Sequence, residues 1–180
     1  MRLWLHRRPS PIGDMLLAWD AEARLRVLDF SDYEERMQTL LRLHYGDCEL
    51  VESALPPSIA DPLRRYFDGD IAAIDTIAVT SGGTEFQRAV WAELRAIPAG
   101  ATISYGELAK RLGKPKAVRA VGGANGANPI GIVVPCHRVI GANGTLTGYG
   151  GGMHRKKWLL AHEAGHGNAA DLFGRQSGAL

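Results

Sequence analysis

Residues 104–126, SYGELAKRLGKPKAVRAVGGANG, predict two short helices joined by a tight turn. Ser104 and Glu107 have the spacing of a capping box, which favours a helix start, and Gly113 is suited to end that helix. Pro115 can open the second helix, because proline is well tolerated in a first turn. Two short helices connected in this way are typical of a helix-turn-helix.

Glycines interrupt the second predicted helix at Gly122, Gly123 and Gly126. Each costs about 1 kcal/mol relative to alanine in a helix interior, so a compensating role is expected. One explanation is that small residues let the helix backbone approach a nucleic-acid groove. The nearby basic residues agree with it: they are Lys110, Lys114, Lys116 and Arg119. Tight packing of the helix against another part of the protein is the alternative.

Charge is divided unevenly along the 180 residues, although the formal net charge is only +2. Residues 1–75 carry nine Lys and Arg against fourteen Asp and Glu, a net of −5, whereas residues 76–180 carry twelve against five, a net of +7. A positive surface attracts phosphates and is the usual electrostatic footprint of nucleic-acid binding. A solvated basic face without any partner would give the same count.

The whole chain predicts an α+β fold in two parts, of which residues 1–78 form a small lobe with an antiparallel sheet and helices. Apolar strands flank a polar turn, and two stretches with helical spacing follow them. The strands are Met15–Trp19 and Leu25–Phe30, and the helices are Glu34–Tyr45 and Ile59–Phe67.

Residues 79–168 predict a second, mainly helical domain that contains the helix-turn-helix and is winged-helix-like. Its first helix is capped by Thr84 and Gln87 and ends before Pro98. Another helix is expected over Met153–His162. We expect residues 169–180 to form a flexible tail.

Cys48 and Cys136 are too few for a disulfide framework, and the N-terminus has no signal-peptide pattern. We therefore expect a cytoplasmic protein. No membrane segment is expected, because the apolar run Met15–Trp19 is far too short to span a bilayer. Cys48 lies in a polar turn without a second sulfur nearby, so we interpret it as an incidental thiol and expect no metal site.

Cys136 follows the β-branched run Ile130–Val134, which predicts a buried strand. A single cysteine is most often a small buried hydrophobe. Here His137 and Arg138 favour a reactive thiolate, because neighbouring positive charge lowers the pKa of a thiol. Adjacent residues of an extended chain point to opposite sides, so His137 is expected to reach the sulfur through a water molecule. Glu163 is the candidate acid that would orient His137.

Five motifs in fixed order resemble the O6-alkylguanine-DNA alkyltransferases over about residues 84–163. They are Ile103-Ser104-Tyr105, Arg119-Ala120-Val121-Gly122-Gly123-Ala124, Asn128-Pro129, Pro135-Cys136-His137-Arg138-Val139 and Trp158-Leu159-Leu160-Ala161-His162-Glu163. The first lobe resembles the family only loosely, through Ser10-Pro11-Ile12-Gly13. The resemblance implies a ribonuclease-H-like fold for residues 1–78. It also implies an irreversible, stoichiometric transfer of an alkyl group from O6-alkylguanine or O4-alkylthymine in duplex DNA to the protein.

The resemblance implies a catalytic role for five residues. Cys136 is similar to the family's alkyl acceptor, with His137 and a water molecule removing its proton. Glu163 would orient that histidine, and Asn128 would brace the turn around the cysteine. Tyr105 matches a tyrosine that crowds the target phosphate and donates a hydrogen bond to the base.

The resemblance also implies contacts with DNA and with the damaged base. Arg119 is similar to the side chain that fills the base stack when the damaged base is flipped out. The other expected DNA-binding residues are Tyr105, Lys116, Ala120, Gly122 and Gly123. The expected substrate-binding residues are Gly131, Val139, Tyr149 and Gly150. Gly131 stands where animal members have proline and Gly150 where they have serine, which leaves the substrate range open.

Two other classes of function use the same residue types. A cysteine hydrolase could employ Cys136, His137 and Glu163, although the helix-turn-helix and the basic charge disfavour it. A DNA-binding regulator could carry Cys136 as a structural or sensing residue. The expected partner is double-stranded DNA carrying O6-alkylguanine. We expect a monomer without cofactor that is nucleoid-associated when bound, and binding of several copies along DNA stays open.

Overall fold

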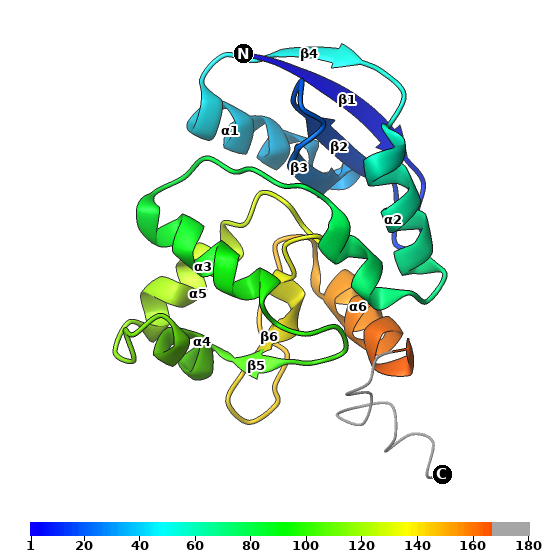
Figure 1. The fold of residues 1–180 in the computed structure, drawn as a ribbon. Helices are drawn as coiled ribbons and strands as arrows, with labels where there is room; N and C mark the ends of the chain where they lie inside the picture. The colour runs from blue at the N-terminus through cyan, green and yellow to red at the C-terminus, as the bar shows by residue number, and fades with distance from the viewer. Residues whose placement is uncertain (167–180) are drawn as a thin grey trace.

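A four-stranded sheet forms the N-terminal lobe in the computed structural model, which describes residues 1–166 (Figure 1). The strands are β1 (Arg2–Arg8), β2 (Met15–Trp19), β3 (Leu25–Phe30) and β4 (Glu49–Glu52), in the spatial order β3-β2-β1-β4. The predicted antiparallel pairing of β2 with β3 is confirmed. β1, which was not predicted, pairs antiparallel with β2, and β4 pairs with β1 in parallel at the edge. The tail predicted over 169–180 and the end of the domain predicted to reach 168 lie outside the described residues.

Both faces of this sheet are covered, which explains why β2 is an unbroken apolar run. Successive side chains of a strand point to opposite faces. Leu16 and Ala18 pack with α1 (Glu34–Tyr45) on one face, and Leu17 belongs to the main core on the other. The second face is covered by α2 (Pro57–Phe67) and by the helical part of the chain (Figure 1). A short 3-10 helix, η1 (Ser31–Tyr33), precedes α1, and another, η2 (Ile71–Thr76), follows α2.

One hydrophobic core joins the residues on either side of the predicted boundary at residue 78. Leu17 and Leu28 of the sheet lie in the same buried cluster as Val121 and Val134. Leu28 also forms a parallel backbone bridge with Ile130. The segment that leads to Cys136 is therefore anchored on the sheet.

The helix-turn-helix is formed by α4 (Tyr105–Arg111) and α5 (Val118–Gly126), which pack beside α3 (Glu85–Arg95). Thr84 and Gln87 make both hydrogen bonds of the predicted capping box. At α4 only the Ser104 side chain accepts, from Glu107 N. The second helix starts at Val118 and not at Pro115. A turn closed by Ala117 N donating to Lys114 O at 2.9 Å comes first.

The strand predicted over Ile130–Val134 is wrong, because these residues form a tight turn after a single bridge at Ile130. Ile132 has a φ of 67°, and Val134 N donates back to Ile130 O at 3.0 Å. The β-branched side chains are buried as expected, so these apolar residues pack in the core without forming a strand.

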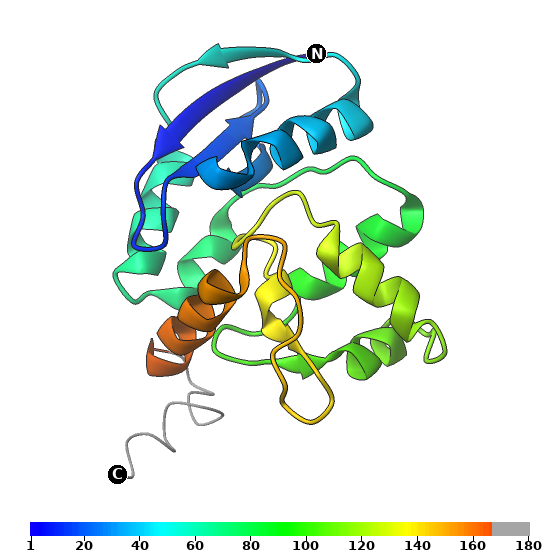
Figure 2. The ribbon, with the colours of Figure 1, turned by 180° about the vertical axis from the view of Figure 1, so that it is seen from behind.

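After this turn the chain forms the 3-10 turn η3 (Cys136–Arg138) and then β6 (Val139–Ile140), which pairs in parallel with β5 (Ile103–Ser104). Residues 141–152 form a long loop that runs past β6 and returns toward the N-terminal lobe (Figure 2). It leads into α6 (Met153–His166), which extends beyond the predicted end at His162. Within residues 1–166, every helix is too short or too polar to cross a membrane.

Candidate active site

Cys136 lies at the start of η3, is 8% exposed and lines a small cavity. The cavity has a volume of about 60 Å³. Its wall comes from both parts of the chain and includes Phe30, Arg36, Asn128, Gly131, Tyr149 and Gly150. A space of this size accommodates a small substituent.

Asn128 holds the turn that leads to Cys136. Its Nδ2 donates to Val134 O at 2.8 Å and to Ile130 O at 3.3 Å, and its Oδ1 accepts from Ile130 N at 3.0 Å. A buried turn has backbone groups that no strand or helix satisfies, and a side-chain amide can supply both donor and acceptor. The left-handed conformation at Ile132 is therefore stabilised by an asparagine outside the turn.

Burial raises the pKa of the Cys136 thiol, and the hydrogen bond from Asn128 and the charges of Lys156 and Arg36 offset this only in part. The expectation that adjacent basic residues lower this pKa is therefore wrong. Arg138 is fully buried and donates to Ile97 O at 2.9 Å, and its charge is paired with a carboxylate. The thiol is consequently protonated at neutral pH, so its reaction requires a base.

The structure brings His137 and Glu163 together, with Nε2 2.7 Å from Oε2. Arg138 Nε donates to the other carboxylate oxygen at 2.7 Å. Burial alone would raise the pKa of Glu163, but the charges and hydrogen bonds of His137 and Arg138 hold it well below its ordinary value. Since an ionised carboxylate only accepts, Nε2 carries a proton and Nδ1 is left as an acceptor in the neutral ring. Nδ1 has no hydrogen-bond partner in the part of the chain that is described.

Tyr66, which no sequence pattern indicated, donates from its hydroxyl to Glu163 Oε2 at 2.6 Å. Burial raises the pKa of Tyr66 well above its usual value, so the hydroxyl stays a donor. This tyrosine comes from α2, 97 residues before its partner, at a position that looks like an ordinary apolar helix face. Nothing in the local sequence distinguishes it from core.

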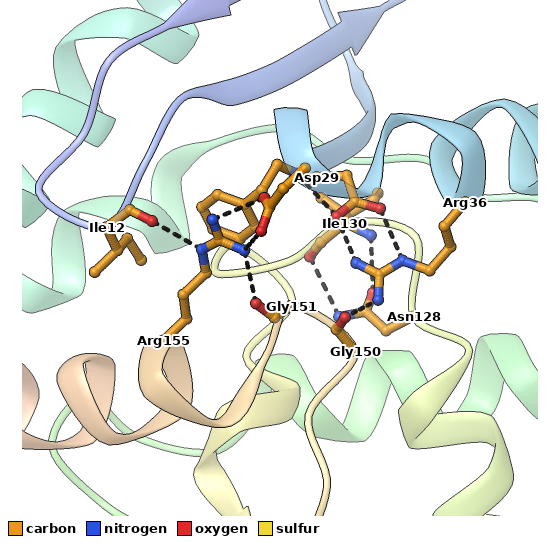
Figure 3. Close-up of polar contacts among 10 residues, drawn as sticks. Ile12, Asp29, Arg36, Asn128, Ile130, Gly150, Gly151 and Arg155 are labelled. Carbon is orange, nitrogen blue, oxygen red and sulfur yellow. Dashed lines mark hydrogen bonds and ion pairs between the residues drawn. The ribbon is translucent and has the colours of Figure 1, made fainter.

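Two arginines hold the part of the loop that lines the cavity (Figure 3). Arg36 of α1 donates to the Gly150 carbonyl and pairs with Asp29, with Nε 3.0 Å from Oδ2. Arg155 of α6 donates to the Gly151 carbonyl at 2.8 Å. The N-terminal lobe therefore shapes a cavity whose cysteine lies in the C-terminal part.

Gly131 and Gly150, the two departures from the animal pattern, have little free space around their Cα atoms. A Cβ at position 150 would lie 2.7 Å from Arg36 Nη1, so any side chain there requires this arginine to move. A Cβ at position 131 would lie 3.3 Å from Leu28 O and 3.6 Å from the Tyr149 hydroxyl. Both glycines thus set how much room the cavity has.

The structure places Val139 outside the cavity lining, fully buried, with its carbonyl accepting from Lys156 Nζ at 2.7 Å. The Cys136 carbonyl accepts from Asn125 Nδ2 at 3.4 Å. The family resemblance implies that the backbone at these two residues reads the guanine edge. A carbonyl oxygen has two lone pairs, and Val139 N also donates to the Cys136 carbonyl, so that oxygen already has two donors.

The face of α5 that carries the expected DNA-binding residues is open. Lys116, Arg119, Ala120 and Gly123 are exposed. A Cβ at Gly123 or at Gly126 would meet no atom within 4 Å, and one at Gly122 would meet only the Tyr105 ring, at 3.8 Å. Tight packing within the protein therefore does not explain these glycines. Their small size leaves the helix backbone free to approach a partner outside the chain.

Tyr105 connects this face to the cavity loop. Its hydroxyl accepts from Thr147 Oγ1 at 3.0 Å, and Thr147 O accepts from Lys156 Nζ at 3.0 Å. The phenol proton is not used in this contact, so Tyr105 can still donate to a ligand. Among residues 1–166, no three His, Cys, Asp or Glu side chains are grouped to hold a metal ion.

A buried cysteine backed by a histidine–carboxylate pair, beside a helix-turn-helix with an open basic face, defines a DNA-binding protein with a cysteine nucleophile. Residues 85–165 match the family model described as 6-O-methylguanine DNA methyltransferase, DNA binding domain. The chain is 52% identical to the methylated-DNA–protein-cysteine methyltransferase of Salmonella typhimurium over 165 residues, which are 91% of this chain and 96% of that protein.

Solved structures agree with this comparison. The fold is similar to that of Mycobacterium tuberculosis O6-methylguanine methyltransferase, with a TM-score of 0.74 and 39% identity over 93% of this chain and 96% of the other. A structure of the Mycobacterium tuberculosis protein in complex with DNA also has a TM-score of 0.74, with 39% identity over 94% and 97% of the two chains. The chain belongs to the family of methylated-DNA–protein-cysteine methyltransferases. This membership favours the transferase over the hydrolase and the regulator.

Proposed function

We propose that the protein repairs duplex DNA by moving an alkyl group from O6 of a flipped guanine, or from O4 of a thymine, irreversibly onto Sγ of Cys136. The observation that supports this best is the cavity of about 60 Å³ at Cys136, which suits an alkyl substituent. Gly126 and Ala127, at the end of α5, line the same cavity, so a base that leaves DNA bound at the helix-turn-helix lies next to the thiol. The protein acts as a monomer on nucleoid DNA in the cytoplasm and needs no cofactor.

The thiol is activated at the moment of reaction and not before it. Because burial raises the thiol pKa, a base must take the proton. His137 Nδ1 is the acceptor, through one water molecule, while Glu163 at 2.7 Å from Nε2 stabilises the imidazolium that forms. Tyr66 and Asn128 are positioning residues. Tyr66 contacts Glu163, and Asn128 contacts the turn that leads to Cys136, so neither needs to touch the substrate.

Transfer forms a bond between Sγ and the alkyl carbon and breaks the bond from that carbon to O6 or O4 of the base. The electron pair of the broken bond stays with the base. Tyr105 donates a hydrogen bond where this negative charge develops, which lowers the barrier. In the net reaction the thiol proton replaces the alkyl group on the base. The thioether keeps no ionisable proton, so the protein cannot return to its starting state.

The base must leave the helix before it can react. Arg119 enters the stack in its place, and Lys116, Ala120, Gly122 and Gly123 let α5 lie against the DNA backbone. Gly131 and Gly150, with Tyr149, line the space for the alkyl group and limit its size. The backbone at Cys136 and Val139 contacts the guanine edge.

Stoichiometry tests the proposed function directly. Incubation with excess duplex containing O6-methylguanine is expected to stop at one methyl group per protein, found on the Cys136 peptide by mass spectrometry. The methylated protein is also expected to melt at a lower temperature, because overpacking a tight site costs about 1–3 kcal/mol. Turnover beyond one equivalent, or a label on Cys48, would contradict the mechanism.

Arg119→Ala is expected to slow repair of duplex DNA on the order of tenfold or more, since unpairing and unstacking a base costs a few kcal/mol that the inserted side chain offsets. Reaction with the free base O6-methylguanine should keep its rate, because no stack has to be opened. Single-turnover kinetics on both substrates give the comparison. The matched control is Arg64→Ala, which removes an exposed arginine of α2 and should change neither rate. Equal slowing on duplex and free base would remove the stack-filling role.

A further inference from the structure

Arg155 is 5% exposed and turns its guanidinium back toward the loop that precedes its own helix (Figure 3). Nη1 donates to Gly151 O at 2.8 Å, and Nε donates to Ile12 O at 2.8 Å. Asp32 accepts from Nη1 at 3.1 Å and from Nη2 at 2.8 Å. One side chain thus joins the cavity loop to two places in the N-terminal lobe.

The turn at residues 10–13, which links the N-terminal lobe loosely to the family, is shaped to receive this arginine. A Cβ at Gly13 would lie 2.8 Å from Arg155 Nη2, and Gly13 has a φ of 116°, where other residues are strained. Gly13 N donates to Ser10 O at 3.2 Å and closes the turn. The guanidinium carbon also lies 4.0 Å from the centroid of the Phe30 ring, a favourable cation–π contact.

The contacts of Arg155 require a planar fork of donors. A lysine has one nitrogen and cannot bond to two carbonyls and a carboxylate in these different directions. The hydrogen bonds from Arg155 hold the pKa of Asp32 below its ordinary value, as expected for a carboxylate that faces a fixed cation. Asp32 itself is half exposed, so the buried arginine, and not the aspartate, has the packing role.

We propose that Arg155 is a positioning residue for alkyl transfer, which holds the loop 149–152 against the N-terminal lobe so that Tyr149 closes one wall of the Cys136 cavity. The inference rests on the proposed function. Tyr149 lines the cavity two residues before the carbonyl that Arg155 binds, so release of Gly151 moves this wall. A displacement of about 1 Å in a positioning group can lower a reaction rate about a hundredfold.

The test compares Arg155→Met with Lys157→Met, a control on the exposed side of the same helix. Single-turnover methyl transfer from a saturating O6-methylguanine duplex is measured together with the rate at which iodoacetamide modifies Cys136. In R155M the transfer rate constant should fall on the order of tenfold to a hundredfold. Duplex affinity and the iodoacetamide rate should not fall, because neither DNA-binding face nor nucleophile is touched. R155K should recover only part of the rate, and K157M should equal the wild type.

Asp32→Asn serves as a second variant, because this half-exposed residue can lose its charge without endangering the fold. It should lower the transfer rate less than R155M does, again without a fall in duplex affinity or in the iodoacetamide rate. If R155M does not fold, D32N tests the positioning role of Arg155. Hydrogen exchange at residues 149–152 should become faster in both variants. A wild-type transfer rate in R155M overturns the inference, and where R155M fails to fold, a wild-type transfer rate in D32N does so. An equal fall in the transfer rate and in the iodoacetamide rate also overturns it. If the wild-type protein itself leaves Cys136 unmethylated, the proposed function fails instead.

Discussion

Replacing Cys136 with serine is expected to abolish methyl transfer while the affinity for methylated duplex stays unchanged. Burial already raises the pKa of the thiol, and a hydroxyl in the same position has a far higher pKa. His137 therefore cannot remove its proton. Loss of the nucleophile in a serine protease lowers kcat about 10⁶-fold, and a comparable loss would put transfer below detection.

Duplex affinity should survive this change, because the exposed face of α5 does not include Cys136. The measurements are methyl transfer under single-turnover conditions and duplex binding by fluorescence anisotropy at fixed salt. Cys48→Ser is the matched control, since it changes the other cysteine, a half-buried thiol between α1 and β4. It should transfer at the wild-type rate. Residual transfer near the wild-type rate in C136S would place the acceptor elsewhere.

Patterns that act within a few residues were read correctly from the sequence. The apolar runs at β2 and β3, the helical spacing of α1 and the capping box of α3 all depend on neighbours in the chain, and the structure has these elements. β1 and β4 were missed. Their burial is partial and their sequences, RLWLHRR and ELVE, mix charged and apolar residues, so the sheet that forms them is a tertiary effect.

The turn at residues 130–134 shows where a local pattern misleads. Its β-branched residues favour a strand, but Asn128 satisfies the backbone groups that a neighbouring strand would otherwise satisfy. Burial without strand pairing is then possible. The pKa of Cys136 was misjudged for a related reason. Sequence proximity places Arg138 next to the thiol, whereas the fold turns it into a pair with Glu163.

Residues that complete the site from a distance could not be predicted. Tyr66 contacts Glu163 across 97 residues, Arg36 contacts the cavity loop across 114, and Arg155 joins that loop to Ile12, 143 residues away. Each is an ordinary residue in an ordinary helix when read alone. Only the family resemblance, and not spacing, indicated that Glu163 belongs with His137.

Replacing Glu163 with glutamine is expected to destabilise the protein by about 3–5 kcal/mol at pH 7, the usual cost of removing one partner from a buried ion pair. The carboxylate is 2% exposed and pairs with Arg138, which is fully buried. Glutamine keeps the shape but leaves that guanidinium without its counter-charge. The matched control is Glu49→Gln, which removes an exposed pair with Arg2 at 2.8 Å and should cost about 0–1 kcal/mol. Urea unfolding gives both values.

The cost of E163Q should depend on pH in a defined direction. The pKa of Glu163 in the folded protein lies well below its ordinary value, so the ionised carboxylate stabilises the fold fully above the unfolded pKa of about 4.3. This stabilisation is lost as the pH falls from there toward the folded pKa. The difference in free energy of unfolding between wild type and variant should therefore be constant near neutrality and shrink below about pH 4. A difference that grows in acid would mean that the carboxylate is not ionised in the fold.

A second substitution tests whether the cost of E163Q comes from the unpaired charge of Arg138. Arg138→Met removes the guanidinium that E163Q leaves unpaired, so the double variant should be at least as stable as E163Q alone. The two single costs should therefore not add, because both single variants disrupt the same buried ion pair. Transfer should stay low in the double variant, since His137 still lacks the charged partner that stabilises its imidazolium. Additive costs in the double variant would show that Arg138 and Glu163 contribute independently, and recovery of transfer would show that His137 does not need the carboxylate.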